Sequence, residues 1–308
     1  MEQETIATVG FFDGVHLGHR YLIRQMQDAA RKANRKTAVI TFPVHPRKVL
    51  QQEYQPLLLN TFEEKLNLLA SAGADYCYVI DFTRAFAEMT AQEFIRQKLH
   101  GQLRVKELLV GYDHKFGKGR ESGFDQYVAY GKACGMTVLR AERLPDTEHP
   151  VSSTLIRKLL SEGKMSEAAE KLSYLYSLEG TVVEGNKLGR TIGFPTANLE
   201  RTDREKIVPP EGVYAVQVHL GTAPGGGKPC RGMAYIGKRP TVLPHGEKRI
   251  EVHLFDFSAD LYGTRLRVEF AGFVRHDIRF NGVEDLRKQL EKDKRQVAML
   301  PGFFAGQQ

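Results

Sequence analysis

Two histidines, His16 and His19, stand three residues apart in the stretch GFFDGVHLGH, which begins at Gly10. A buried strand should end just before them and a helix should begin with them, so both side chains lie on one side of its first turn. Such a turn offers free backbone N–H groups and the positive end of the helix dipole, and Gly18 lets a ligand approach closely. The motif predicts a phosphate site suited to charge that develops at the α-phosphate of a nucleotide. Two incidental histidines beside a turn are the plainer alternative.

A cluster of hydroxyl groups opens another predicted helix, VSSTLIRKLL. Ser153 and Thr154 can cap this helix through their side-chain oxygens. With Arg157 one turn further on, the same helix start could also hold a pyrophosphate group. The residues alone leave capping and phosphate binding equally open.

The stretch EGNKLGRTIGFPTANLE carries the second set of candidate residues. Gly185, Gly189 and Gly193 suit a loop whose backbone N–H groups point at phosphates, although a hairpin turn explains them as well. No GK[ST] follows, so this is not a Walker A loop. Thr196 and Asn198 are two apart on an extended segment and face the same way, so their neutral oxygens can complete a magnesium shell beside ATP phosphates. A β-turn that ends in Asn is the alternative.

The first half of the chain alternates apolar runs with helical patterns, and these elements must position the histidine motif. Strands are expected at 5–12, 37–42, 75–81, 107–113 and 136–142, and helices after residue 16 and near 62–72, 90–99 and 124–134. Strands that are apolar throughout and separated by helices indicate a parallel sheet covered on both faces. Ligands of such sheets bind beyond the carboxyl ends of the strands.

From about residue 174 the pattern changes to strands separated by segments rich in Gly and Pro. Strands are expected at YSLEGTVV, GVYAVQVHL, CRGMAYIG, RIEVHLFDF and LRVEFAGFV, with a helix at SEAAEKL before them and an amphipathic helix at GVEDLRKQLEKDKRQV after them. We therefore place a domain boundary near residue 173, between an α/β domain over 1–172 and a small β-barrel domain over 173–308.

Composition limits the class of protein. The chain has 308 residues, 42% of them hydrophobic and 26% charged, which suits two globular domains. Cys77, Cys134 and Cys230 form no CxxC pair, so neither a disulfide framework nor a zinc cluster is expected. No signal peptide or membrane-spanning run is evident, and we expect a cytoplasmic protein. The net charge of +7, from 44 basic and 37 acidic residues, suits nucleotides and keeps nucleic acid as a rival partner.

The N-terminal motifs together resemble those of bacterial bifunctional riboflavin kinase/FAD synthetases. GFFDGVHLGH is similar to the nucleotidyltransferase signature, and TFPVHPR, DFTRAFAEMTAQEFI, LLVGYDHKFGKGRESG and VSSTLIR resemble other segments of that family. Three features depart from its pattern: His114 stands at an aromatic position, Pro43 is displaced from its place before His45, and the short leader is almost missing, as trimming would explain. The resemblance implies nucleotide contacts at Gly10, Phe11, Asp13, Gly14, His16, Gly18, His19, Gly111, Asp113, Ser153, Thr154 and Arg157.

The C-terminal half resembles the riboflavin kinase part of the same family. GRTIGFPTAN is similar to its signature, and VPPEGVYAV, MAYIGKRPT, IEVHLFDF, DLYG and FVRHDIRF extend the likeness over residues 174–300. The resemblance makes Glu251, the sole acidic residue between Glu247 and Asp256, the general base for the ribityl 5′-hydroxyl, with a solvent-facing rim glutamate as the alternative. It also implies nucleotide contacts at Gly185, Lys187, Gly189, Gly193, Thr196 and Asn198, magnesium ligation by Thr196 and Asn198, and flavin contacts by Glu251 and Arg275.

The resemblance as a whole implies an α/β nucleotidyltransferase-like parallel-sheet domain followed by a small Greek-key β-barrel domain with a C-terminal helix. Riboflavin would be phosphorylated to FMN, and AMP from a second ATP would then join FMN to give FAD and pyrophosphate, with Mg²⁺ in both steps. We expect flavins and ATP as partners, no nucleic acid or membrane partner, and a monomer or weak homo-oligomer.

Three alternatives to this interpretation stay open. A nucleic-acid enzyme is one, since HxGH also marks aminoacyl-tRNA synthetases, although the companion lysine motif of those enzymes is lacking. A flavin-binding or storage module with inactive sites is another. The third is a flavin- or nucleotide-binding protein that keeps one of the two activities.

Overall fold

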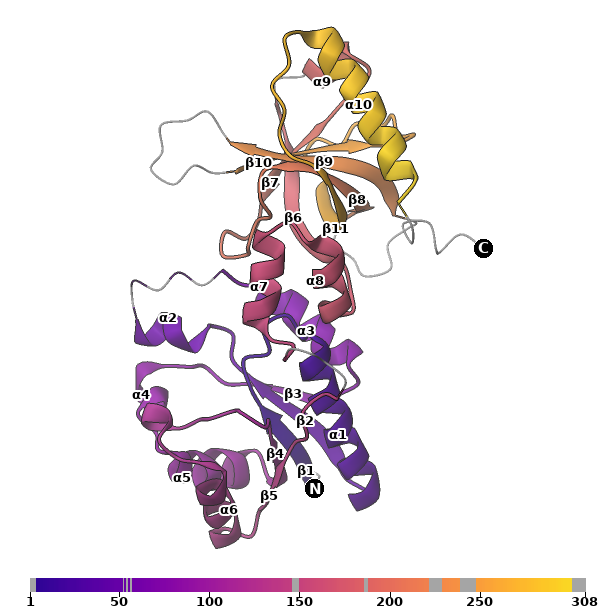
Figure 1. The fold of residues 1–308 in the computed structure, drawn as a ribbon. Helices are drawn as coiled ribbons and strands as arrows, with labels where there is room; N and C mark the ends of the chain where they lie inside the picture. Colours follow the sequence, from indigo (N-terminus) through magenta and orange to yellow (C-terminus); the bar gives the residue numbers. More distant parts are fainter. Residues whose placement is uncertain are drawn as a thin grey trace. The chain divides into compact units, whose positions relative to one another are not determined.

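The computed structural model describes residues 4–51, 53, 55, 57–145, 150–185, 188–221, 229–238 and 248–300. The chain forms two compact units, Met1–Ser153 and Thr154–Gln308 (Figure 1). We name them the α/β unit and the barrel unit after their sheets.

A parallel sheet of five strands, in the order β3-β2-β1-β4-β5, forms the centre of the α/β unit. Its strands are β1 (Thr5–Val9), β2 (Lys36–Thr41), β3 (Tyr76–Val79), β4 (Val105–Val110) and β5 (Thr137–Arg140). Its helices are α1 (Leu17–Ala33), α2 (Pro46–Leu50), α3 (Phe62–Ser71), α4 (Arg84–Ala87), α5 (Ala91–Glu93), the π-helical η1 (Phe94–Gln102), the 3₁₀ turn η2 (Lys118–Arg120) and α6 (Phe124–Ala133). The parallel sheet is confirmed, and each strand ends earlier than predicted because its last residues turn into the motif loops.

Alternation of side chains along the strands divides the core of the α/β unit into two layers. Ala7 and Leu108 pack on one face of the sheet with η1 and α6, whereas Ile6 and Leu109 pack on the other face with α1 and α3. Figure 1 shows α1 on one side of the strands and α5 and α6 on the other. The sheet is therefore covered on both faces, as its apolar strands predict.

Six antiparallel strands close the barrel in the order β10-β7-β6-β11-β8-β9. They are β6 (Tyr176–Val183), β7 (Ala197–Arg201), β8 (Gly212–Leu220), β9 (Cys230–Lys238), β10 (Lys248–Leu254) and β11 (Arg265–Arg275). Four helices accompany them in the described ranges: α7 (Ser153–Ser161), α8 (Met165–Leu172), α9 (Leu188–Thr191) and α10 (Val283–Ala298). The barrel with its C-terminal helix confirms the predicted fold, whereas β7 was not predicted as a strand because Leu199 alone is buried in it.

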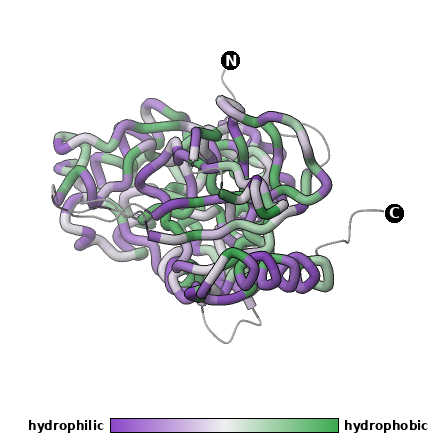
Figure 2. The backbone as a smooth tube through the Cα atoms, turned by 90° about the horizontal axis from the view of Figure 1, so that it is seen from above, coloured by the Kyte–Doolittle hydropathy of each residue, from purple (hydrophilic) through white to green (hydrophobic). Residues whose placement is uncertain are grey.

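Two helices cover the outside of the barrel. On α8, Met165, Ala168 and Leu172 are buried, and the hydroxyl of Ser166 donates to the carbonyl of Ala271 on β11 at 3.5 Å. The other helix, α10, buries little apolar surface, and Figure 2 shows it as mostly hydrophilic along its length. The compact units divide before α8, so α8 belongs to the barrel unit, and the functional boundary near residue 173 stays a prediction.

Within the described ranges, no helix is both long and apolar enough to cross a membrane.

Candidate active sites

The histidine motif forms the junction between β1 and α1. His16 is the N-cap of α1, is 5% exposed, and accepts a hydrogen bond at Nδ1 from the backbone N–H of His19 at 3.4 Å. The two rings stack with centroids 3.7 Å apart and planes inclined by 18°. Because Nδ1 of His16 accepts, the neutral ring carries its proton on Nε2, which becomes the donor. The structure therefore brings the two imidazoles together in one turn.

His19 is kept neutral by its surroundings. Burial, and to a smaller extent the neighbouring His16 and His114, lower the pKa of His19 well below its usual value. The side chain as a whole is half-buried, but its Nδ1 is buried and has no hydrogen-bond partner within the part of the chain that the structure describes. A buried polar atom without a partner is costly, so this nitrogen marks the turn as a candidate functional site.

The backbone between β1 and α1 is strained. Phe12, Gly14 and Val15 have φ angles of 57°, 84° and 35°. A positive φ at a non-glycine residue costs of order 1–3 kcal/mol and persists only where the surroundings over-determine it. The phosphate turn, which we define as residues 10–15, is therefore held in place by contacts from outside.

Asp13 accepts two of these contacts. It is 5% exposed, and its carboxylate accepts the backbone N–H of Leu59 at 3.0 Å. Its carbonyl accepts the hydroxyl of Ser153 at 2.8 Å. Ser153, the last residue of the α/β unit, thus helps to hold the phosphate turn of the same unit. Thr154 and Arg157 belong to the barrel unit, and their contact with a nucleotide stays a prediction.

The other predicted nucleotide contacts follow the ends of central strands. The N–H of Gly10 donates to a carbonyl of β2 at 3.0 Å, and a Cβ on Gly18 would lie 3.2 Å from the capping imidazole. Gly111 and Asp113 come directly after β4, and the carbonyl of Gly111 accepts the N–H of His114 at 3.1 Å. Parallel strands that end together bring such residues to one edge of the sheet.

His114 is a site residue that the sequence indicated only as a departure from the family pattern. Burial, and to a smaller extent the positive charge of Arg120, lower the pKa of His114 to about 4. The negative charge of Asp113 opposes this shift. Since His114 also lowers the pKa of His19, a third imidazole lies near the pair. A polar side chain at a normally aromatic position was the one signal available in the sequence.

The kinase candidates come together at the start of β7 and on β10 of the barrel. The hydroxyl of Thr196 donates to Oε2 of Glu251 at 3.3 Å, and Asn198 is the direct partner of Glu251 across the two antiparallel strands. The second carboxylate oxygen, Oε1, lies 2.8 Å from Nε of Arg249, an ion pair whose N–H is not aligned as a hydrogen bond. The Glu251 side chain is 19% exposed, so the carboxylate is half-buried between these partners.

In the loop before β7, neighbouring atoms come so close to two of the glycines that a side chain would not fit. A Cβ on Gly185 would overlap the side-chain amide of Asn198, and one on Gly189 would overlap the backbone of its own loop. Gly193 has a φ of 81°, which favours glycine. Lys187 lies outside the described residues.

The side chains of Thr196, directly before β7, of Asn198 on β7 and of Glu251 on β10 suit magnesium. Thr196 and Asn198 offer neutral hydroxyl and amide oxygens, and the carboxylate of Glu251 lies beside them. Hard oxygen donors with few protein charges are typical of magnesium sites in which substrate phosphates supply further ligands. The donor set therefore fits the ion.

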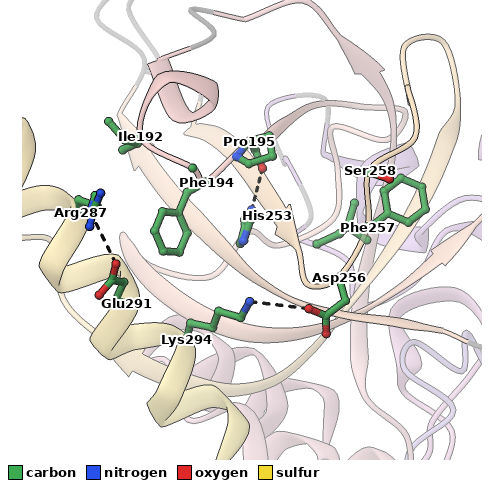
Figure 3. Close-up of a pocket in the computed structure, with 12 residues that line it drawn as sticks. Ile192, Phe194, Pro195, His253, Asp256, Phe257, Ser258, Arg287, Glu291 and Lys294 are labelled. Carbon is green, nitrogen blue, oxygen red and sulfur yellow. Dashed lines mark hydrogen bonds and ion pairs between the residues drawn. The ribbon is translucent and has the colours of Figure 1, made fainter.

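A cavity of about 680 Å³ lies between the loop before β7, the end of β10 and α10 (Figure 3). Phe194 and Pro195 line it directly before Thr196, and His253 lines it two residues after Glu251. Nδ1 of His253 lies 2.8 Å from the carbonyl of Pro195, which fixes the loop against β10. The volume is typical of small-molecule sites.

Charged side chains border the same cavity. Lys294 of α10 points toward Asp256 with a separation of 3.9 Å, and Arg287 lies 3.7 Å from Glu291 (Figure 3). Burial lowers the pKa of His253, and the hydrogen bond to the carbonyl of Pro195 opposes this shift. Apolar walls with a few polar groups are the usual composition of a ligand site.

Tyr235 and Asp277 are further residues near Glu251 that the sequence did not single out. Tyr235 faces Glu251 in the pairing of β9 with β10. Burial, followed by the charge of Asp277, raises the pKa of Tyr235, so its hydroxyl stays protonated. The segment FVRHDIRF therefore reaches the candidate kinase site through Asp277.

Comparison with known proteins accounts for both halves of the chain. The FAD synthetase family model matches residues 1–155, and the riboflavin kinase family model matches residues 172–300. The relatives include a bifunctional riboflavin kinase/FMN adenylyltransferase from Escherichia coli K12, 39% identical over 95% of this chain and 91% of the relative. The chain belongs to the bifunctional riboflavin kinase/FMN adenylyltransferase family.

Further relatives support this membership in the family. Proteins of the same name from Haemophilus influenzae and Bacillus subtilis are 40% and 35% identical, each over 96% of this chain and over 93% and 92% of their own length. A solved structure named as a macrolide-efflux protein from Streptococcus pneumoniae has a TM-score of 0.88 and 32% identity, over 97% of this chain and 95% of that one. Its name applies to that protein, and the shared fold applies to both.

Arg275, for which family resemblance implies a flavin contact, is engaged elsewhere in this structure. Its Nε lies 3.0 and 2.9 Å from the two carboxylate oxygens of Asp293, and its terminal nitrogen lies 2.8 Å from one of them. Gln289 donates to the same carboxylate at 2.8 Å. Asp293 is fully buried and only 15% of the Arg275 side chain is exposed, so the pair fastens α10 to the end of β11. A flavin contact by Arg275 stays a prediction.

We expect Asp293→Ala to lower the free energy of unfolding of the barrel unit by about 3–5 kcal/mol, since it leaves the Arg275 guanidinium buried without its partner. Chemical denaturation of the full chain measures the change. Asp285→Ala, on the exposed first turn of α10, is the matched control and should cost less than about 1 kcal/mol. Equal effects of the two substitutions would contradict the structural role of the pair.

Proposed function

We propose that the chain is a flavin enzyme with two active sites. The barrel unit transfers the γ-phosphoryl group of ATP to the 5′-hydroxyl of riboflavin, and the α/β unit transfers AMP from a second ATP to the resulting FMN. The matches of both halves to family models support two activities over one, and over a binding module. The observation that carries the proposal is the 3.3 Å contact of Thr196 with Glu251, which joins a metal-ligand candidate to a base candidate.

In the barrel, Glu251 is the general base. One carboxylate oxygen takes the proton of the ribityl hydroxyl while the oxygen of that hydroxyl forms a bond to the γ-phosphorus and the bond to ADP breaks. Arg249 and Thr196 hold the carboxylate from both sides. Magnesium held by Thr196 and Asn198 would neutralise charge on the phosphates.

In the α/β unit, a phosphate oxygen of FMN attacks the α-phosphorus of ATP, and the bond to pyrophosphate breaks. A phosphate monoester is already a nucleophile, so no base is required. The imidazole N–H groups of His16 and His19 and the N–H groups of the α1 terminus donate to the charge that develops there. The guanidinium of Arg157 is assigned to the leaving pyrophosphate.

We also propose which partners the protein binds and where in the cell it acts. Flavins and ATP are the small-molecule partners, nucleic acid and membranes are not partners, and the protein is a cytoplasmic monomer or weak homo-oligomer. The paired sites for phosphates, and charged residues spread over the whole chain, support small anionic ligands.

The two by-products, ADP and pyrophosphate, test the proposal. With riboflavin, ATP and magnesium, one ADP should form for each riboflavin that is phosphorylated, counted as FMN plus FAD. With FMN as the flavin, one pyrophosphate should form for each FAD. ADP release without a phosphorylated flavin, or FAD formation without pyrophosphate, would contradict the assigned reactions.

We expect the fragment Thr154–Gln308 to fold and phosphorylate riboflavin unaided, because it includes the whole barrel unit. The shorter fragment from Ser173 marks the predicted domain boundary, but it lacks α8 and its buried Met165 and Leu172, each worth about 1.5–3 kcal/mol. It should keep kinase activity with a lower melting temperature. A folded longer fragment without kinase activity would show that the kinase site needs the α/β unit.

A further inference from the structure

Lys65 is a buried cation beside the phosphate turn, and the proposed mechanism does not use it. It lies on α3, whose start is fixed by the reciprocal hydrogen bonds of Thr61 and Glu64, and it is 2% exposed. Lysine is almost never fully buried unless it is paired, since an unpaired ammonium is costly to remove from water. The contacts of this ammonium therefore indicate its role.

The ammonium bridges the ends of two neighbouring strands. Nζ of Lys65 donates to the carbonyl of Phe42, the residue after β2, at 2.6 Å and lies 3.9 Å from the ring centroid of Phe11, two residues after β1. At that distance a cation is attracted to the face of an aromatic ring. The Phe11 ring also meets the His45 ring edge-on at 4.7 Å, and the Phe11 carbonyl accepts the hydroxyl of Thr41 at 3.2 Å. Lys65 thus helps to fix Phe11 within the phosphate turn.

The backbone that follows Phe11 requires such a restraint. Phe12 and Val15 have positive φ angles of 57° and 35°, and His16 comes directly after them as the cap of α1. A strained backbone of this kind keeps its form only where neighbouring groups hold it. The negative charge of Asp13, in the same turn, favours the charged form of the lysine.

We propose that Lys65 is a positioning residue for adenylyl transfer, whose buried ammonium clamps Phe11 and Phe42 and so holds the phosphate turn that aims His16 and His19 at the phosphates. This inference rests on the proposed adenylyltransferase activity of the α/β unit. Lys65 acts through the turn, and its charge is required, since a neutral side chain gives neither the cation–π contact nor the charge-assisted hydrogen bond.

The charge of Lys65 titrates in an accessible range. Burial lowers the pKa of Lys65 from 10.5 to about 8, and the charges of Asp13 in the turn and Cys77 on β3 oppose this shift. The rings of Phe11 and Phe62 pack on the ammonium. Because the folded-state pKa lies below the unfolded value, the unfolded chain binds more protons between these two pH values, and the contribution of this group to stability rises with pH there. Loss of the charge should therefore reduce activity without unfolding the protein.

The test uses the full chain and measures FAD formation from FMN and ATP as a function of pH. For wild type, kcat should fall as the pH rises through about 8 while the melting temperature is kept. Lys65→Met should lower kcat by about 100-fold, change KM for FMN less, and remove the fall near pH 8. Lys65→Arg, whose guanidinium stays charged, should keep its activity to higher pH. Lys32→Met, at an exposed lysine of α1, is the control, and riboflavin phosphorylation in each preparation is the internal standard.

The results that would overturn the role of Lys65 differ from the result that would overturn the proposed adenylyltransferase activity. Wild-type kcat in Lys65→Met, or an unchanged fall near pH 8 in both Lys65 variants, would overturn the role of Lys65. If Lys65→Met does not fold, the profiles of wild type and Lys65→Arg decide, and identical profiles overturn it. A wild type that forms no FAD at any pH would instead remove the adenylyltransferase assignment itself.

Discussion

Glu251→Gln should abolish FMN formation while FAD still forms from added FMN. The amide cannot accept the ribityl proton, and loss of a general base typically costs about 100- to 10,000-fold in rate. The substitution keeps the size of the side chain and the contact with Thr196, so the barrel should remain folded. Separation of the flavins after incubation with riboflavin and ATP, and separately with FMN and ATP, measures both activities.

Glu269→Gln is the matched control for this experiment. Glu269 is also a strand glutamate paired with an arginine, Arg267 at 2.9 Å, and its side chain is 15% exposed, against 19% for Glu251. Its carboxylate contacts His219 and none of the kinase candidates that the structure describes, so phosphorylation should continue at the wild-type rate. Near-normal FMN formation by Glu251→Gln would remove Glu251 from the role of base.

His19→Ala should slow FAD formation by about a hundred- to a thousandfold and weaken ATP binding less. Loss of one preorganised donor to a developing charge typically raises the barrier by about 2.7–4 kcal/mol. Nδ1 of His19 is buried without a partner among the described residues, so the substitution breaks no hydrogen bond at that atom. Incubated with riboflavin and ATP, the variant should accumulate FMN, because the kinase residues all lie in the other unit.

His16→Ala should show the same loss of rate together with a loss of stability. His16 accepts the N–H of His19 as the cap of α1, and removal of a capping side chain costs about 0.5–2 kcal/mol. Comparison of the melting temperatures therefore separates the two effects. Wild-type FAD output from both histidine variants would show that the motif only shapes the turn.

The sequence predicts those parts of the fold that depend on local pattern. Helical spacing predicts an apolar stripe on α1 of Leu22, Ile23, Met26, Ala30 and Ala33. Ile23, Met26 and Ala30 are buried, and the other two are half-buried, because helical periodicity reports the buried face of a helix directly. The pairing of Thr196 with Glu251 could be expected only from family resemblance, since 55 residues separate them and strand register is set by the closed barrel.

Other features depend on contacts between residues that are distant in the chain, so the sequence does not predict them. Lys65 stands in the charged stretch EEK, which is typical of a solvent-exposed helix face, and its burial follows from the carbonyl of Phe42 and the ring of Phe11. Asp293 likewise lies in EKDKRQ, yet it is fully buried because Arg275 neutralises it. Short helices such as α2 and α4 were missed because side-chain caps, not periodicity, define them.

A time course of wild-type protein with riboflavin, ATP and magnesium, followed by chromatographic separation of the flavins, measures both proposed reactions in one experiment. We expect FMN to appear first, FAD to follow at the expense of FMN, and chelation of the metal to stop both steps. If neither FMN nor FAD forms under these conditions, the assignment of two flavin-directed phosphate transfers to this chain is wrong.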